Sequence, residues 1–390
     1  MFTRKILLLA GSIAVIGANS LALSPIASAV AVSFPGVDAA GVMKAAAAYG
    51  LATAASALML APAIDRIGQQ TALVRALLAL VAALALSAFA PNLLVLCLAQ
   101  ALAGLAAGCA LPAIYALSAQ VAEKGRESQT LGMVLTGWTA SLVVGVSLSA
   151  LVADFADWRF VFVGLSIAAG GLAVAVRRSR DLAIPAPSAR SSSPLTALRV
   201  RGMCPALLTV ASYMTAFYGL YAYLGPHLTG VLRLSTASAG LAPAAYGIGF
   251  GIAAFVDRWL DRYGAAAAAP VAFLGLGLVY AALAAASAHA AILVAACLAW
   301  GFANHLGLNL IVGRLTALDP AQQGAIMGLY SAVTYLAVSA GAIFYQPLFE
   351  RVGFAGCALT SAGCIVSALA MSLVQARRRS MPLVGDEAPQ

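Results

Sequence analysis

Five polar side chains lie deep within long apolar runs of the chain: Asn19, Gln100, Asn304, His305 and Asn309. Amide and imidazole groups can both donate and accept hydrogen bonds, and histidine titrates near neutral pH. This set could therefore bind a neutral solute or carry a proton. In hydrocarbon each group needs a partner, so the alternative is that these side chains only hold neighbouring helices together.

Aromatic residues recur at helical spacing near some of these polar groups. Trp300 and Asn304, like His305 and Asn309, are four residues apart and so stack along a helix face. Rings with a few fixed polar groups are typical of ligand pockets, although such stripes are more often simple packing. We expect no catalytic residue, and we expect the substrate-binding residues to be Asn19, Gln100, Tyr213, Phe217, Tyr221, Trp300, Asn304, His305, Asn309 and Tyr330.

The acidic residues point away from buried charge chemistry. All thirteen Asp and Glu residues fall in predicted loops, tails or helix ends. Buried ionisable groups mark ion relays in membranes, so their absence from the predicted spans favours a neutral or weakly polar substrate. Protons remain an open alternative as a coupling ion, with His305 as their carrier. The sequence has no phosphate-binding or metal-type motif, and we expect no cofactor and no metal.

The elements that position these residues must be membrane helices. Hydrophobic residues make up 63% of the chain and charged residues only 9%. Apolar runs of about twenty residues, each able to cross ~30 Å of hydrocarbon, recur along nearly the whole chain without strand-like alternation. The fold class is thus an all-α membrane protein, with twelve predicted spans at 6–31, 39–62, 71–89, 93–118, 130–153, 160–176, 204–226, 237–256, 265–286, 291–313, 323–347 and 352–375.

The net charge of +9 follows from topology and does not require a nucleic-acid partner. With the N-terminus inside, only Lys44, Arg159, Arg233 and Arg351 of the 22 basic residues fall outside the cytoplasmic segments. The positive-inside rule then places both termini in the cytoplasm. We predict a six-helix bundle over 1–176, a cytoplasmic linker over 177–203, a second six-helix bundle over 204–376 and a cytoplasmic tail over 377–390.

An internal repeat with an offset near 196 residues relates the two halves. Asp65, Arg66 and Gly68 of a D-R-x-G motif recur as Asp261, Arg262 and Gly264, at the ends of spans 2 and 8. Other pairs, such as Asp154 with Glu350 and Trp158 with Phe354, keep the same offset. A repeated bundle can hold a binding site between its halves near the bilayer midplane and expose it alternately to either side.

The chain resembles the major facilitator superfamily over nearly all of its length. That family's loop between helices 2 and 3 has a G-x-x-x-D-R-x-G-R/K-R/K pattern, and residues 61–70 keep its D-R-x-G core without the first glycine or the two final bases. The resemblance implies that the two D-R-x-G motifs form a gate. Within the family, residues 221–226 and the placement of Pro25 are similar to arabinose-efflux-like permeases of the drug/proton-antiporter group.

Three departures set the chain apart from proton-coupled exporters of that group. Gln100 stands where an arginine linked to proton coupling is common, Asn19 replaces an acidic residue, and Gly145-Val146 replaces a Gly-Pro pair. Proton antiport therefore does not follow from the resemblance.

We expect a monomeric transporter in the cytoplasmic (inner) membrane, not an enzyme, which moves a small organic solute such as a drug-like compound or a sugar. Export rests on the resemblance alone. The alternatives are an uptake carrier of the same fold and a transporter-like receptor that binds its ligand without moving it.

Overall fold

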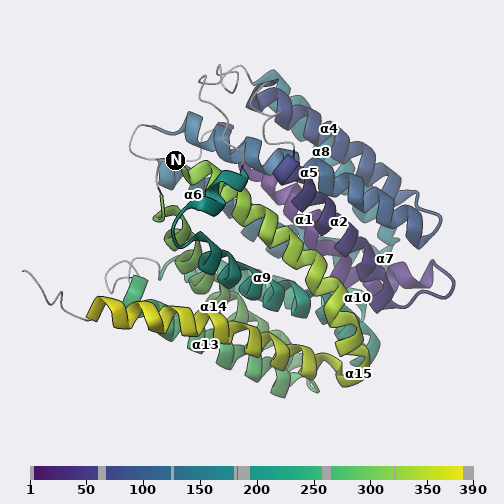
Figure 1. Ribbon diagram of the computed structural model, residues 1–390. Helices are drawn as coiled ribbons and strands as arrows, with labels where there is room; N and C mark the ends of the chain where they lie inside the picture. The colour runs from purple at the N-terminus through teal and green to yellow at the C-terminus, as the bar shows by residue number, and fades with distance from the viewer. Residues whose placement is uncertain are drawn as a thin grey trace, which may run out of the picture.

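The computed structural model describes residues 4–59, 67–123, 127–179, 182, 194–256, 265–319 and 322–380, and every regular element in these ranges is a helix. The helices lie roughly side by side, and the first residues of the chain and the end of the last helix lie at the same end of the bundle (Figure 1). We call the opposite end the distal end. Because hydrocarbon offers no hydrogen bonds, a chain this apolar satisfies its backbone within helices.

The N-terminal half contains six spans, the fifth of which is made of three consecutive helical segments. Its elements are α1 (Arg4–Val32), α2 (Ala39–Met59), α4 (Gln69–Ala88), α5 (Leu93–Val121), α6 (Glu127–Ala140), the π-helix η1 (Ser141–Val146), α7 (Ser147–Phe155) and α8 (Trp158–Arg178).

The C-terminal half repeats this order after the short 3₁₀ helix η3 (Pro194–Arg199). Its elements are α9 (Met203–Pro226), the π-helix η4 (His227–Val231), α10 (Thr236–Ala239), α11 (Leu241–Ala253), α13 (Ala265–Ala286), α14 (Ala290–Thr316) and α15 (Gln323–Ser380). The α15 assignment covers two spans, because Gly353 takes a φ of 70° there. Glycine adopts a positive φ without the steric penalty of a side chain, so the helix turns back at this residue.

Short capped turns close the distal end. The side chains of Asp38, Asn92, Asp157 and Ser235 each accept a hydrogen bond from a backbone N–H in the first turn of the helix that follows. Such caps satisfy amide groups that a helix start leaves without partners. The caps therefore fix where α2, α5, α8 and α10 begin and keep their turns short.

The predicted fold of twelve transmembrane helices in two six-helix halves is confirmed. Ten candidate spans are long and apolar enough in the described residues, and one of them, the 49-residue stretch Ala325–Leu373, is long enough for two crossings. The described part of span 8, α10 with α11, supplies the remaining crossing. The main difference from the prediction lies in span 5, which contains a π-helix instead of a uniform α-helix.

The repeat is visible in how the helices pack. A side chain on Gly104 of α5 would overlap the carbonyl oxygen of Tyr49 of α2, and one on Gly301 of α14 would overlap that of Tyr246 of α11. Gly301 follows Gly104 by 197 residues, and Tyr246 follows Tyr49 by the same number. Small residues let membrane helices approach this closely, so the α2–α5 and α11–α14 contacts are equivalent interfaces.

We predict that Gly104→Ala and Gly301→Ala each lower stability by about 1–3 kcal/mol, because a methyl group must force tightly packed backbones apart. The matched control is Gly171→Ala in α8, where an added Cβ meets no atom within 4 Å. Thermal unfolding of the purified protein should show a lower transition temperature for the first two variants only. Equal unfolding temperatures for all three variants would contradict the packing described above.

Candidate functional site

The two halves meet along α1 and α9. The Ser24 hydroxyl of α1 donates a 2.6 Å hydrogen bond to the Tyr221 carbonyl of α9 and accepts one of 3.2 Å from the Gly225 N–H. One turn further along, the hydroxyls of Ser28 and Thr229 lie 2.6 Å apart. These bonds are between small side chains and backbone, so the two helices are in close contact near the distal end.

Two further contacts between the halves flank this pair. The Ser339 hydroxyl of α15 donates a 2.9 Å bond to the Ala47 carbonyl of α2. On the other side, the Thr236 N–H of α10 donates a 2.9 Å bond to the Asp154 carboxylate of α7. Apart from the Ser339–Ala47 contact, which lies near the middle of its helices, these residues lie in the distal parts of their helices. The distal end of the interface is therefore closed.

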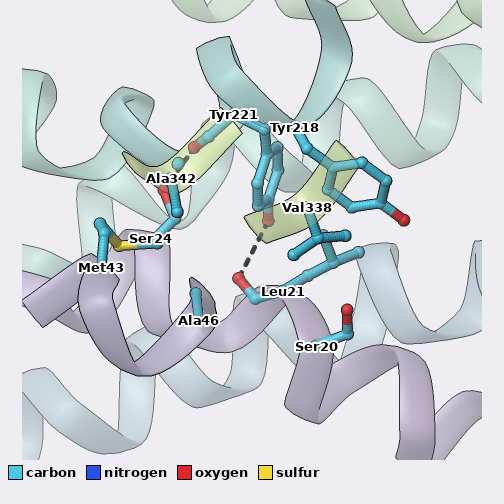
Figure 2. A pocket seen from close by; sticks show the side chains of 10 residues that line it. Ser20, Leu21, Ser24, Met43, Ala46, Tyr218, Tyr221, Val338 and Ala342 are labelled. Carbon is cyan, nitrogen blue, oxygen red and sulfur yellow. Dashed lines mark hydrogen bonds between the residues drawn. The ribbon is translucent and has the colours of Figure 1, made fainter. Parts of the chain in front are cut away.

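A small pocket remains between the halves beside these contacts, lined by α1, α2, α9 and α15 (Figure 2). It leaves about 20 Å³ for the centre of a water-sized sphere, enough for about one water molecule and too little for an organic solute. Figure 2 shows Ser20, Tyr218 and Val338 at one side of the pocket, and Tyr221 with Ser24 at the other.

Five tyrosines from both halves gather next to this pocket, and we call them the tyrosine cluster: Tyr49 of α2, Tyr115 of α5, Tyr218 of α9, and Tyr330 and Tyr335 of α15. The phenols of Tyr218 and Tyr335 each lie within electrostatic range of the other four, and that of Tyr115 lies within range of Tyr330. The rings of Tyr49 and Tyr335 meet edge to face, with 6.0 Å between their centroids. The cluster therefore spans the interface between the halves.

Part of the tyrosine cluster is accessible although it lies deep in the bundle. Tyr115, Tyr218 and Tyr330 are each surrounded by protein, yet each keeps a partly exposed surface. Of these three, Tyr218 also lines the pocket. The three rings are therefore the accessible members of the cluster.

Several hydroxyls beside the tyrosine cluster have unused hydrogen-bonding capacity. The Tyr49 and Tyr335 hydroxyls are buried without a hydrogen-bond partner, and so are those of Ser20 on α1 and Thr334 on α15. The Tyr49 hydroxyl does lie near those of Ser20 and Tyr335, without completing a hydrogen bond. Buried polar groups are normally paired, so these four hydroxyls require an explanation.

Asn19 and Gln100 are brought together within the N-terminal half. The Asn19 amide donates a 3.1 Å bond to Gln100 Oε1, and the Gln100 amide donates to Asn19 Oδ1 and to the Ser87 hydroxyl, at 3.3 and 3.0 Å. Both amides are almost completely buried. The pair thus joins α1, α5 and α4, as expected for an interhelical hydrogen-bond network.

Tyr213, Phe217, Trp300 and Asn304 are brought together in the C-terminal half. The ring centroids of Phe217 and Trp300 lie 5.5 Å apart, and the Tyr213 hydroxyl donates a hydrogen bond to the backbone carbonyl of Asn304. The Asn304 amide also lies 2.5 Å from the hydroxyl of Tyr246 on α11, whose ring packs 5.0 Å from Trp300. These residues are largely buried and hold α9, α11 and α14 together.

The remaining predicted site residues have separate environments. The His305 ring packs edge to face on Phe250 of α11 at 4.7 Å, and Asn309 is exposed. Tyr221 donates a 3.3 Å bond to the Leu21 carbonyl across the interface between the halves. Tyr330 is part of the tyrosine cluster.

The sequence analysis did not select Tyr49, Tyr115, Tyr218 or Tyr335 for the site. In the sequence, Tyr49 precedes Tyr246 by 197 residues, close to the offset of the repeat, and Tyr218 directly follows Phe217. Tyr115 follows Pro112 in an apolar run, and Ser118 is its one polar neighbour at helical spacing. Its position opposite the C-terminal half depends on how the halves pack.

The D-R-x-G motifs lie mainly outside the described residues, which include Gly68 but not Asp65, Arg66, Asp261, Arg262 or Gly264. Gly68 precedes α4 with a φ of 81°, a conformation that favours glycine. Gln70, at one of the positions without the family's basic residue, donates bonds of 2.8 and 2.9 Å to the Val176 and Ser179 carbonyls at the end of α8. Its amide therefore satisfies carbonyls that a helix end leaves free.

Comparison with known proteins identifies relatives along almost the whole chain. The uncharacterised MFS-type transporter YwfA of Bacillus subtilis (strain 168) is 26% identical over 368 residues, which cover 92% of this chain and 88% of the relative. A probable sugar efflux transporter of Mannheimia succiniciproducens is 23% identical, with 74% of this chain and 73% of the relative covered.

The fold matches that of solved transporters. The xylose transporter XylE from E. coli, in a partially occluded inward open conformation, superimposes with a TM-score of 0.73 at 13% identity, covering 98% of each chain. The sequence profile of the Major Facilitator Superfamily matches residues 6–342. On the strength of that match, with the repeated halves and their closed distal interface, the chain belongs to the Major Facilitator Superfamily.

Proposed function

We propose that this secondary transporter exports a small organic solute, which it binds between its two halves and releases by alternating access. The observation that carries the proposal is the tyrosine cluster, with surfaces from both halves beneath a closed distal end. The naming of a relative as a probable sugar efflux transporter supports the export direction. A drug-like compound and a sugar are both compatible with this function.

The closure at the distal end gives the proposed cycle its structural basis. It consists of hydroxyl and backbone hydrogen bonds such as those of Ser24 and Ser28, each worth about 0.5–1.5 kcal/mol. Contacts of this strength can break and re-form as one half rocks against the other. In the opposite state the distal end would open and the solute would leave there.

We propose that the termini face the cytoplasm and the distal end faces the outside. The distribution of basic residues supports this orientation, because the exceptions, Lys44, Arg159, Arg233 and Arg351, all belong to distal parts of the chain. By this assignment the linker over 177–203 and the tail over 377–390 are cytoplasmic, and the protein works as a monomer in the inner membrane.

The orientation predicts that a cysteine introduced at Ser192, in a cysteine-free background, does not react with a membrane-impermeant thiol reagent in intact cells. It should react after the cells are opened. A cysteine at Asn92, in a distal turn, is the matched control and should react from outside. The reverse labelling pattern would place the termini outside and refute the assignment.

The proposed cycle predicts that Gly225→Ala shifts the protein towards a state with an open distal end. A side chain at this position would overlap the backbone of Ser24 on α1 in the closed state. We expect a cysteine at Ala46, a lining residue of the pocket, to be labelled from the distal side several-fold faster in this variant.

The matched control is Gly230→Ala, five residues further on, where an added Cβ has no neighbour within 4 Å. This variant should label at the rate of the parent protein. If Gly225→Ala also leaves the labelling rate unchanged, the Ser24 contact does not control opening.

The D-R-x-G motifs are proposed to gate the cytoplasmic side, as the family resemblance implies for Asp65, Arg66 and Gly68 and for Asp261, Arg262 and Gly264. These residues follow α2 and α11 in the chain. Ala47 of α2 and Thr236 of α10, which directly precedes α11, make contacts between the halves described above. A gate at the other end of the same helices would couple the two sides of the transporter.

The transport proposal predicts that the purified protein in liposomes moves solutes from a panel of drug-like compounds and sugars. Flux should be measured with and without an imposed pH gradient, in both directions. Stimulation by the gradient would establish proton coupling, and flux without stimulation would exclude it. Net accumulation inside intact cells would identify an uptake carrier. Binding without flux would identify a receptor. Either result would overturn the proposal of export.

The same assay tests His305 and Asn309 on α14 as members of the site. His305→Gln retains hydrogen bonding but cannot titrate near neutral pH. Loss of gradient dependence with binding retained would identify His305 as a proton carrier, and loss of binding would identify it as a solute ligand. Unchanged kinetics at every pH would remove it from the mechanism.

A further inference from the structure

The unused hydroxyls at the interface between the halves indicate what kind of solute fits there. Ser20 and Tyr49 belong to the N-terminal half, and Thr334 and Tyr335 to the C-terminal half, and none of their side-chain oxygens has a hydrogen-bond partner. Leaving a buried polar group unpaired costs stability, whereas a bound solute that pairs with it recovers that cost. The solute should therefore carry a small number of oxygen atoms that can pair with hydroxyls from both halves.

The surfaces around these hydroxyls are mainly aromatic. Tyr49 and Tyr335 present their rings at 6.0 Å from each other, and Tyr115, Tyr218 and Tyr330 keep accessible surfaces nearby. Aromatic rings prefer to stack on, or meet edge to face with, other flat rings. The shape and chemistry of the walls thus favour a planar ring over a flexible chain.

The uncharged surroundings of the tyrosine cluster argue against an ionic solute. In the described part of the chain, the side chains that interact with the phenols of the tyrosine cluster are uncharged: Ser20, Thr53, Trp138, Thr334 and the other tyrosines. The residues that line the neighbouring pocket are also uncharged. A buried charge needs an opposite charge close to it, so a solute without net charge is favoured.

The amide groups argue against a sugar. A sugar ring offers several adjacent hydroxyls, and amides are suited to them because one side chain both donates and accepts. Asn19 and Gln100, however, bind each other and Ser87, and they are almost completely buried. The Asn304 amide nitrogen is bound to Tyr246, which leaves only its carbonyl oxygen. The four unpaired groups at the interface are single hydroxyls, two of them on aromatic rings.

We propose that the tyrosine cluster binds an uncharged aromatic solute with hydroxyl or carbonyl oxygens. Its ring lies against the partly exposed rings of Tyr115 in the N-terminal half and of Tyr218 and Tyr330 in the C-terminal half, and its oxygens pair with Tyr49 and Tyr335. The proposal rests on the transport function proposed above, and narrows the solute from drug-like compound or sugar to one chemical class.

The test is calorimetric titration of the full-length protein in lipid nanodiscs with four probes. Three share one ring and differ in charge: 4-hydroxyacetanilide is neutral, 4-hydroxybenzoate is an anion and tyramine is a cation. Xylose is the neutral sugar. We expect 4-hydroxyacetanilide to bind more tightly than the other three. Absence of binding by this probe, or tighter binding of either ion or of xylose, would overturn the proposal.

Substitutions in the tyrosine cluster test whether the solute binds there. Tyr49→Phe and Tyr335→Phe should each weaken 4-hydroxyacetanilide binding about three- to tenfold, the expected loss for one hydrogen bond. The matched control is Tyr280→Phe in α13, because the Tyr280 hydroxyl is also buried without a partner but lies outside the cluster. This control should bind as the parent protein does. Equal effects of all three substitutions, or none, would refute the assignment of the site.

Thermal unfolding of each variant separates loss of binding from loss of the fold, since removal of an unpaired hydroxyl should leave the unfolding temperature close to that of the parent. The liposome assay separates this inference from the function on which it rests. Flux of xylose but not of 4-hydroxyacetanilide would refute the solute class and leave transport intact. Binding of 4-hydroxyacetanilide without flux of any probe would refute transport and leave the site intact.

Discussion

The absence of water in hydrocarbon is the constraint on which the structure depends. Every polar group inside a membrane must be paired by the protein itself or by what the protein binds. Within the N-terminal half, Asn19, Gln100 and Ser87 follow this rule by pairing with one another. At the interface between the halves, the hydroxyls of Tyr49 and Tyr335 do not. We propose that the paired amides hold the fold and that these two hydroxyls are available to a solute.

The same contrast holds for the close contacts between helices. Gly104 and Gly301 lie at interfaces inside a half, whereas Gly50 and Gly225 lie at interfaces between the halves. Contacts of the first kind must persist if each half moves as a unit, and those of the second kind must break when the distal end opens. Under the proposed cycle, the chain thus uses glycine for two purposes, permanent packing and reversible closure, and only the three-dimensional arrangement distinguishes them.

Much of the architecture could be predicted from the sequence, because it depends on local properties. Apolar length fixes the spans, and the repeat fixes their arrangement in two halves. The site was harder to predict. Polarity in an apolar run singled out Asn19 and Gln100, but it could not show that these two amides satisfy each other across 81 residues. Tyr115 has no local signal, because its importance arises from tyrosines that only the packing of the halves brings near it.

The π-helix η1 shows why a local pattern was insufficient in span 5. This segment contacts α1 of its own half, where Ala18 packs on Gly145, and α11 of the other half, where Val143 packs on Gly247. A π-helix contains an extra residue per turn, which widens the helix and changes the direction of its side chains. Span 5 thus contacts its own half and the other half on different faces, and in the proposed cycle only the second contact would change. The segment Ser141–Val146 contains no proline, so local sequence shows no sign of this departure from a regular α-helix.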